Sequence, residues 1–566
     1  MNRAERRRQD KLGEKAIGSD RTRQALALLA EGASHHQAGR LQQAESIYRQ
    51  ALDLHPDHPE ALHLLGLLAY RVGQLDKAEA LLCRAIRQDA KNPLYHFNLG
   101  VVLQKDGRTE EAAESYRKAL SLNPNYVEAQ NNLGNALRDV GQVQEAIDAY
   151  RRALALNPHY VEAHNNLGVA FKEHGDLDRS LASYEDALRL NPNHAEAHCN
   201  KGIACQEQGR IEEAMMAFQS ALHVRPDYAK AQHGLGLAYQ WQQRFDLAFA
   251  ALRTSADLQH NRDRPTPIAR VYRSRIKHDA EQIQYLFDRD LLAPEHAPYL
   301  AALKSLNHRL AQESQSAKQL SLDNQARVAI APSFNRILHY GDSPALAHGA
   351  LNPELHVEEI EGRYLGRKPE IMFVDHLLRE EALQSLTRFC LESTIWKRDY
   401  ENGYIGAFLG EGFCSPLILQ IADELRLRFP RIFRDHRLKQ AWAFKYDSAL
   451  TGLNIHADAA AVNVNFWITA DEANLDPGSG GLAVWDKEAP KEWNFKVYND
   501  GRNRGKILEF LKDQNAKPVT IPYRENRAVI FNSDLFHETD RFRFKDEYES
   551  RRVNVTLLYG NRLHEA

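Results

Sequence analysis

The sequence predicts a multidomain protein in which an all-α solenoid of helical repeats precedes an α+β domain built on short β-strands. Two observations support this prediction. Glycines recur every 34 residues from Gly32 to Gly236, and such a period is typical of stacked helical repeats. After residue 370 the sequence changes to short runs of β-branched and aromatic residues bounded by Gly, Pro, Asn or Asp. Short strands without interleaved helices favour a sandwich or barrel.

The overall composition excludes several classes of protein. The chain has 566 residues and a formal net charge of −3, so nothing in the charge balance indicates a nucleic acid or an anionic membrane as partner. No run of about 18 apolar residues occurs, and we therefore expect no membrane span. The composition leaves the oligomeric state open.

Cysteine usage and the N-terminus bear on the compartment. The five cysteines are odd in number and scattered, with no C-x-x-C pair, which favours a reducing environment. Residues 1–24 are basic but no apolar stretch follows them, so we expect a disordered tail rather than a secretory signal. A cytoplasmic location is the resulting expectation.

Four residue series share the repeat period between residues 25 and 262, where seven units fit. A second glycine series runs from Gly39 to Gly209, small residues recur from Ala44 to Ala248, and several units end in proline. This pattern resembles the tetratricopeptide repeat. The resemblance implies two antiparallel helices per unit, which stack on their neighbours into a solenoid with a concave groove. Such a groove binds ligands and performs no chemistry.

One polar series follows the same period inside the predicted groove. Asparagine occurs two residues before the first glycine in four successive units, at Asn98, Asn132, Asn166 and Asn200. An amide offers both a donor and an acceptor, which suits the backbone of an extended peptide. The sequence N-N-L-G at residues 131–134 and 165–168 resembles the solenoid of O-GlcNAc transferases, in which such a ladder holds substrate polypeptide. Alternatively, these amides bridge helices within the stack, and the sequence leaves both interpretations open.

Beyond the repeats, we expect residues 263–330 to form a helical connector with no evident chemistry. We expect residues 331–566 to form the second folded domain. In that domain we expect helices at 380–392 and 415–428. The expected strands lie at 371–374, 440–446, 462–469, 481–485, 528–532 and 553–559.

Three residues of this domain form a candidate metal site. His456 and Asp458 are separated by one residue, so a strand or extended loop projects both side chains to one side. His537 follows the expected strand 528–532. Two imidazoles and one carboxylate make the facial triad of non-haem iron(II) oxygenases, which leaves three coordination positions open. The H-x-D motif alone is weak, because His55 and Asp57 at a repeat boundary match it too.

An arginine strengthens the assignment. Arg552 opens the last expected strand, and its guanidinium suits a bidentate, charge-assisted pair with the distal carboxylate of 2-oxoglutarate. The adjacent Arg551 is the alternative candidate for binding this carboxylate. We favour Arg552, since it has the strand parity of Asn554 and Thr556.

Residues 440–559 resemble the double-stranded β-helix, a jelly-roll or cupin-like fold, of the prolyl-hydroxylase-type 2-oxoglutarate oxygenases. The resemblance rests on Tyr446, on His456 and Asp458, on the G-S-G-G-L-A-V-W segment at 478–485, on His537, and on Arg552 with Thr556. It implies that the triad binds iron(II), that Arg552, assisted by Thr556 and Tyr446, binds 2-oxoglutarate, and that dioxygen is consumed.

One position departs from that family. Where a tyrosine often lies near the co-substrate, this chain has a strand with Asn463 and Asn465 on one face. These two amides either hydrogen-bond the co-substrate or are ordinary strand residues.

The resemblance implies a 2-oxoglutarate-dependent dioxygenase that hydroxylates its substrate. Because a solenoid joined to a hydroxylase recurs in aspartyl/asparaginyl and leprecan-type prolyl hydroxylases, a peptide or protein held by the repeats is the first expectation. One alternative is an oxygenase of small molecules or glycans whose solenoid docks a partner. The other is a non-catalytic interaction scaffold.

Overall fold

The computed structural model describes residues 21, 23–261, 270–312, 319–434, 436–448, 455–490, 493, 498–499 and 503–561. The chain divides into an N-terminal unit, Met1–Pro192, and a C-terminal unit, Asn193–Ala566. Most of the predicted basic tail, 1–24, lies outside the described residues, although residues 21, 23 and 24 are helical.

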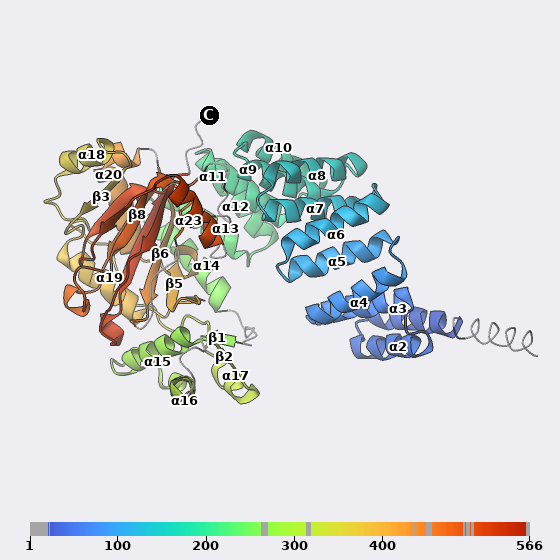
Figure 1. Cartoon of the computed structure of the whole chain (residues 1–566). Helices are drawn as coiled ribbons and strands as arrows, with labels where there is room; N and C mark the ends of the chain where they lie inside the picture. Colours follow the sequence, from blue (N-terminus) through green and yellow to red (C-terminus); the bar gives the residue numbers. More distant parts are fainter. Residues whose placement is uncertain are drawn as a thin grey trace, which may run out of the picture. The chain divides into compact units, whose positions relative to one another are not determined.

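The N-terminal unit consists of antiparallel helix pairs (Figure 1), of which the first combines residues 23–37 with α2. The helices are α2 (Leu41–Leu54), α3 (Pro59–Arg71), α4 (Leu75–Gln88), α5 (Pro93–Lys105), α6 (Thr109–Leu122), α7 (Val127–Asp139), α8 (Val143–Leu156), α9 (Val161–Glu173) and α10 (Leu177–Leu190). Two more pairs open the C-terminal unit: α11 (Ala195–Glu207), α12 (Ile211–Val224), α13 (Ala229–Trp241) and α14 (Phe245–His260). The all-α solenoid predicted from the period is therefore confirmed.

The two glycine series have different physical reasons. Gly100 lies against a buried ring of the paired helix, and a Cβ there would be only 2.6 Å from Cε1 of Tyr116. Gly107 has no atom near its Cβ position but adopts a φ of +83°, which side-chain-bearing residues rarely take. The first series thus lets two helices approach, and the second turns the chain between them. In the last repeat Gln243 replaces the second glycine and still has a φ of 59°.

The predicted connector contains a small apolar core of its own. Its elements are β1 (Arg270–Tyr272), α15 (Arg273–Phe287), η1 (Pro294–His296), α16 (Ala297–Gln312), β2 (Gln319–Ser321) and α17 (Asn324–Ile330). The strands β1 and β2 pair antiparallel.

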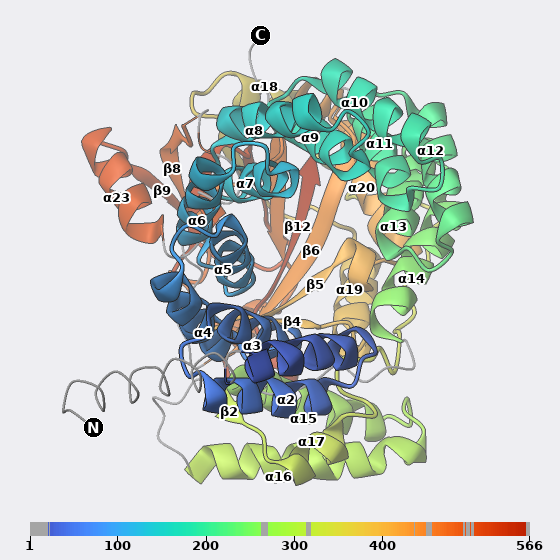
Figure 2. The ribbon, with the colours of Figure 1, turned by 90° about the vertical axis from the view of Figure 1, so that its right-hand side faces the viewer.

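The rest of the C-terminal unit is built on two antiparallel sheets, with strand orders β3-β10-β7-β12-β6-β5-β4 and β11-β8-β9. Figure 2 shows β12, β6 and β5 side by side. The strands are β3 (Ile371–Val374), β4 (Arg398–Asp399), β5 (Tyr404–Phe408), β6 (Leu438–Tyr446), β7 (Val462–Trp467), β8 (Leu482–Glu488), β9 (Pro518–Ile521), β10 (Ala528–Asn532), β11 (Leu535–Thr539) and β12 (Val553–Tyr559). The helices and 3-10 turns around them are α18 (Val357–Leu365), α19 (Glu380–Glu392), η2 (Leu409–Glu411), α20 (Pro416–Arg428), α21 (Pro430–Phe433), η3 (Asp471–Ala473), α23 (Arg504–Asp513) and η5 (Tyr548–Ser550).

The larger sheet has two different faces because residues alternate along each strand. On the outer face, Val464 of β7 and Val555 of β12 pack with apolar residues of α19 and α20. On the inner face, Val529 and Phe531 of β10 pack with Val484 of β8 in the smaller sheet. The two sheets therefore face each other across an apolar core.

The connector and the last repeat form hydrogen bonds with the sheet domain. In the connector helix α15, the Gln282 amide donates to the carbonyl oxygens of Leu391 and Ser393 at 3.0 and 2.9 Å. From the last repeat, Trp241 Nε1 donates to the Leu438 carbonyl at 2.8 Å. The last repeats and the connector are thus packed onto the sheet domain. No helix in the described residues is long and apolar enough to cross a membrane.

Candidate metal centre

An antiparallel bridge brings the histidines of the predicted triad together. His456 forms an antiparallel bridge with His537 of β11, and the two residues exchange backbone hydrogen bonds of 3.0 and 2.8 Å. Their ring centroids are 4.3 Å apart. The sequence predicts β10 correctly but misses β11, which carries His537. This strand is only five residues long, and its pairing with a distant segment leaves little local signal.

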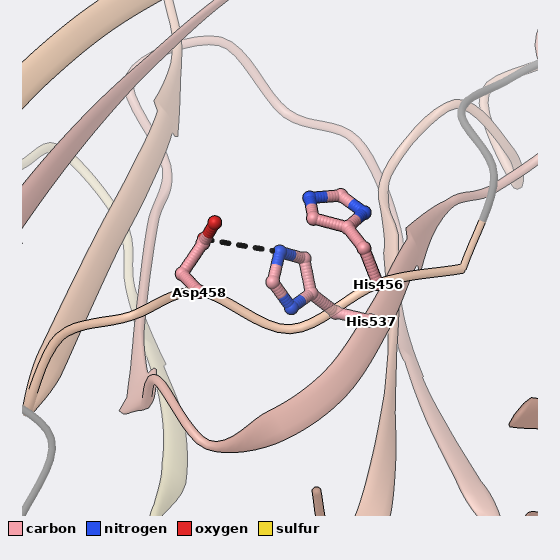
Figure 3. A group of neighbouring side chains, drawn as sticks. All are labelled: His456, Asp458 and His537. Carbon is pink, nitrogen blue, oxygen red and sulfur yellow. Dashed lines mark ion pairs between the residues drawn. The ribbon is translucent and has the colours of Figure 1, made fainter. Parts of the chain in front are cut away.

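Asp458 completes the cluster. Its backbone N–H donates to the Ser533 carbonyl at 3.1 Å, which holds the H-x-D segment beside the turn between β10 and β11. Asp458 Oδ2 lies 3.4 Å from His537 Nε2 (Figure 3). One ligand atom from each of His456, Asp458 and His537 lies within 4.8 Å of the others. This spacing suits simultaneous coordination of one ion.

Hydrogen bonds orient both buried ligands. His537 Nδ1 is 3.1 Å from the Leu535 carbonyl oxygen, so a proton on Nδ1 leaves the Nε2 lone pair for a metal. The Asn463 amide donates to Asp458 Oδ2 at 2.7 Å. Burial alone raises the pKa of Asp458, but the neighbouring histidines and the Asn463 amide outweigh it and hold that pKa below its ordinary value. Asp458 is therefore a carboxylate, as a metal ligand must be.

A polar stripe extends from the triad along the inner face of the larger sheet. Thr556 of β12 lies opposite Asn465 of β7, whose amide donates to the Thr556 hydroxyl at 2.9 Å. Asn465 also lies opposite Val529, which contacts the smaller sheet. Buried polar side chains in the middle of an apolar core are unfavourable unless they have partners, so such a stripe indicates a site.

Several polar atoms of this stripe lack a partner. Oδ1 of Asn463, Oδ1 of Asn465 and Nε1 of Trp467 are buried, and none has a hydrogen-bond partner within the part of the chain that the structure describes. A native interior satisfies most such groups, so a bound molecule is the expected partner.

Arg552 lies at the far end of the stripe and is 1% exposed. Its guanidinium donates to the Gly480 carbonyl at 2.7 Å and to Asn554 Oδ1 at 3.3 Å, and its Cζ lies 4.7 Å from the Tyr446 ring centroid. No carboxylate of the described residues pairs with it. Burial accordingly lowers the pKa of Arg552 from its ordinary value. A buried cation with only neutral partners is energetically unfavourable, and an anion would compensate its charge.

Arg551 has the opposite environment. Its guanidinium forms ion pairs with Glu281 of α15 at 2.7 Å and with Asp447 at 3.1 Å. Although burial opposes it, the charges of these carboxylates raise the pKa of Arg551. Arg551 therefore fastens the connector helix to the sheets, and its charge is already neutralised.

The asparagine series lies partly within the helix stack. In the N-terminal unit Asn98 Nδ2 is 2.7 Å from His63 Nε2, and the Asn166 amide donates to Asn131 Oδ1 at 3.0 Å. Asn132 is half-buried. In the C-terminal unit Asn200 is 4% exposed and accepts a hydrogen bond from Lys230 Nζ. These contacts support helix bridging for at least three members of the series.

Comparisons with known proteins concern the repeats. Models described as "TPR repeat" match residues 105–137, 134–175 and 204–243, and models described as "Tetratricopeptide repeat" match 35–97 and 165–223. Residues 35–97 and 105–243 therefore contain tetratricopeptide repeats. Such repeats form protein-interaction surfaces. All the residues matched by these models lie between 35 and 243, outside the two-sheet domain.

Several solved structures are also similar to part of the chain. The crystal structure of MamA is 30% identical, with 29% of this chain and 97% of that chain covered and a TM-score of 0.28. YrrB, described as a TPR protein with an unusual peptide-binding site, is 24% identical, with 31% and 92% covered and a TM-score of 0.27. A tetratricopeptide repeat protein from Parabacteroides merdae is 19% identical, with 43% and 95% covered and a TM-score of 0.37. No curated protein matches the sequence.

Proposed function

We propose that the two-sheet domain is an iron(II)- and 2-oxoglutarate-dependent dioxygenase that hydroxylates a peptide or protein. One observation carries the proposal: the His456, Asp458 and His537 cluster lies on the same polar stripe as Arg552, which has no carboxylate partner among the described residues. The triad alone also suits zinc, which takes two imidazoles and a carboxylate in hydrolases. The buried guanidinium favours a site that also holds an organic acid.

The ligand set fits ferrous iron. Two imidazole nitrogens and one carboxylate oxygen are the donors of the facial triad, and both buried ligands have the outer hydrogen bonds that orient metal ligands. When bound, iron(II) with 2-oxoglutarate and dioxygen supplies the oxidising power for hydroxylation. The protein's residues hold these reactants, orient them and exclude water.

The polar stripe fits 2-oxoglutarate. The Arg552 guanidinium would bind its distal carboxylate. The guanidinium faces the Tyr446 ring, so Tyr446 would line that end of the site. Asn463 and Asn465 each use the amide nitrogen on a protein partner and keep an unpartnered oxygen. An amide oxygen accepts hydrogen bonds only, so it does not attract a carboxylate. These two oxygens would accept from a bound water or from the substrate instead.

The strand order supports a jelly-roll for this domain. Apart from β8 and β9, successive strands alternate between the sheets. The strand β6 lies in the larger sheet, the His456 segment then pairs with β11 of the smaller sheet, and β7 lies in the larger sheet again. Both β8 and β9 lie in the smaller sheet. The sequence then passes to the larger sheet in β10, to the smaller in β11 and back in β12. Such alternation between two antiparallel sheets is how a jelly-roll winds.

The test is an anaerobic titration of the purified chain with iron(II) and 2-oxoglutarate, followed by measurement of succinate once air is admitted. We expect one iron per chain, 2-oxoglutarate binding that requires iron, and succinate release. Cell extract incubated with the enzyme should contain a polypeptide heavier by one oxygen atom. Binding of zinc with hydrolysis of a substrate, and no succinate, would contradict the proposal.

A second function is a protein-interaction scaffold in which the two-sheet domain has no catalytic role. The tetratricopeptide repeats favour it directly, because all the residues matched by the family models lie in the solenoid. The same titration separates the two functions, since a scaffold would bind neither iron nor 2-oxoglutarate.

A further inference from the structure

A cavity of about 740 Å³ lies within the C-terminal unit, where the last repeats meet the sheet domain. From the repeats it is lined by the segment before α13, by Lys230 of α13 and by the end of α14; from the sheet domain, by residues around β4 and η2. In Figure 2, α13 and α14 run beside the sheets of this unit. A cavity of this size holds more than a single inorganic ion.

The lining carries more positive than negative charge. Its four cations are Arg225, Lys230, Lys397 and Arg398, against the carboxylates of Asp227 and Glu411. Arg398 is neutralised by Glu411 at 2.5 Å. The other three cations have no carboxylate partner among the residues that the structure describes. Arg225 is exposed and stacks on the Tyr228 ring with its Cζ 3.6 Å from the centroid.

Lys397 marks the inner end of the cavity. It is half-buried, and its Nζ donates to the Arg336 carbonyl at 2.5 Å. Burial, with the charge of Arg275, lowers the pKa of Lys397 to about 7. The nearby His260 also has a pKa lowered, to about 3, by burial and by the charges of Lys397, Arg275 and Arg398. Its Nε2 is buried without a hydrogen-bond partner among the described residues. Burial is the main cause of both pKa shifts, and the nearby positive charges add to it.

The cavity is connected to the asparagine series. Lys230, which lines it, donates from Nζ to Oδ1 of Asn200 at 3.1 Å. Asn200 is the member of the series that lies in the same unit as the cavity. Cations spread over two repeat segments and the sheet domain match the spaced carboxylates of a chain better than one compact anion.

We propose that this cavity binds the carboxylate side chains of an acidic polypeptide segment. The inference deepens the peptide-binding part of the proposed function and names the charge of the segment that the repeats take. It does not depend on the metal site, because neither the triad residues nor Arg552 line the cavity. Glutamate or aspartate side chains would pair with Lys397 inside, and with Arg225 and Lys230 nearer the solvent.

The experiment measures fluorescence anisotropy of a labelled octaglutamate peptide with the full chain, without iron or 2-oxoglutarate. Binding should weaken as salt is raised. Lys397→Gln should raise the Kd about tenfold, since a charge-assisted hydrogen bond is lost. The double variant Arg225→Gln/Lys230→Gln should raise it about fivefold, because these partners are exposed. Labelled octalysine should not bind.

Lys118→Gln is the matched control, since Lys118 is an exposed lysine of α6 in the other unit and lines no part of the cavity. It should leave the Kd unchanged. Thermal unfolding of each variant verifies that it is folded, and the Arg225/Lys230 variant keeps the test valid if Lys397→Gln is unstable. Unchanged octaglutamate binding in the folded variants would overturn the proposal. So would displacement of octaglutamate by glutarate or inorganic phosphate at concentrations near the peptide's own Kd, which would indicate a small-anion site.

Because the assay contains no co-substrate, its failure leaves the oxygenase proposal standing. Conversely, absence of succinate production leaves the peptide-binding proposal standing.

Discussion

The repeats and the two-sheet domain use asparagine amides in different ways. In the repeats an amide contacts a residue about one period away, as Asn98 contacts His63 and Asn166 contacts Asn131, each 35 positions apart. In the sheet domain Asn465 contacts Thr556, 91 positions away. The first kind of contact follows from a local period. The second exists only because β7 and β12 pair in one register, so the site depends on the whole domain being folded.

The largest effect should follow loss of a metal ligand. His537→Ala and Asp458→Asn each remove one donor, and we expect iron binding and succinate production to fall to background. Asn463→Ala removes only the hydrogen bond to Asp458 and should weaken metal affinity by about 10–100-fold. Metal analysis and succinate assays measure both effects. Succinate production by His537→Ala at the rate of the parent protein would remove that residue from the triad.

Substitution of the two adjacent arginines should affect different properties: 2-oxoglutarate binding for Arg552 and stability for Arg551. Arg552→Ala should weaken 2-oxoglutarate binding by about 3–5 kcal/mol, because the distal carboxylate loses its partner in a buried site. Arg551→Ala should instead lower the free energy of unfolding by about 2–3 kcal/mol. This value is reduced from that of a fully buried pair because the Glu281 side chain is 26% exposed. The 2-oxoglutarate dependence of turnover and urea unfolding of the apo-protein provide the two measurements.

If Arg551→Ala impaired co-substrate binding more than Arg552→Ala did, the assignment based on strand parity would be wrong.

Substitution of two glycines of one repeat tests whether each destabilises the solenoid through its own local contacts. Gly100→Ala places a methyl group against Tyr116 and should lower stability by about 1–3 kcal/mol through overpacking. Gly107→Ala meets no neighbour but strains a positive φ, and should cost about 1–2 kcal/mol. Urea unfolding followed by circular dichroism measures both.

The smaller Tyr116→Leu should partly rescue Gly100→Ala and should not rescue Gly107→Ala. Neither glycine variant should change iron binding, and a change would show that the two regions are coupled.

The smallest single effects belong to the asparagine series. Each Asn→Ala substitution should lower peptide binding or stability by only about 0.5–1.5 kcal/mol, the net contribution of one hydrogen bond. The quadruple variant at Asn98, Asn132, Asn166 and Asn200 should lose polypeptide hydroxylation while it still converts 2-oxoglutarate slowly without substrate. If it hydroxylates polypeptide as well as the parent protein does, the series does not hold the substrate.

Much of the secondary structure could be predicted from the sequence. The helix α19 and the strands β3, β10 and β12 have the bounds that the residue pattern predicts. The missed strands β4, β5, β9 and β11 are five residues or shorter. Strands of that length form by pairing, so their own residues carry too little pattern to reveal them.

The contacts of the connector also could not be predicted from its own residues. Its residues contain no recognisable motif, yet Glu281 and Gln282 of α15 contact Arg551 and the chain after α19. Nothing local to residues 263–330 indicates those partners, because they lie more than one hundred positions away.

By itself, the sequence determined the helical repeats and the candidate ligands His456, Asp458 and His537, since both depend on spacing along the chain. Only the tertiary structure decided that Arg551 is neutralised while its neighbour Arg552 is buried with no carboxylate partner among the described residues. It also decided that Oδ1 of Asn463 and Oδ1 of Asn465 have no partner within the described part of the chain, and that the last repeats meet the sheets around a cationic cavity. Charge compensation and burial depend on residues far apart in the chain, which only folding brings within hydrogen-bond range.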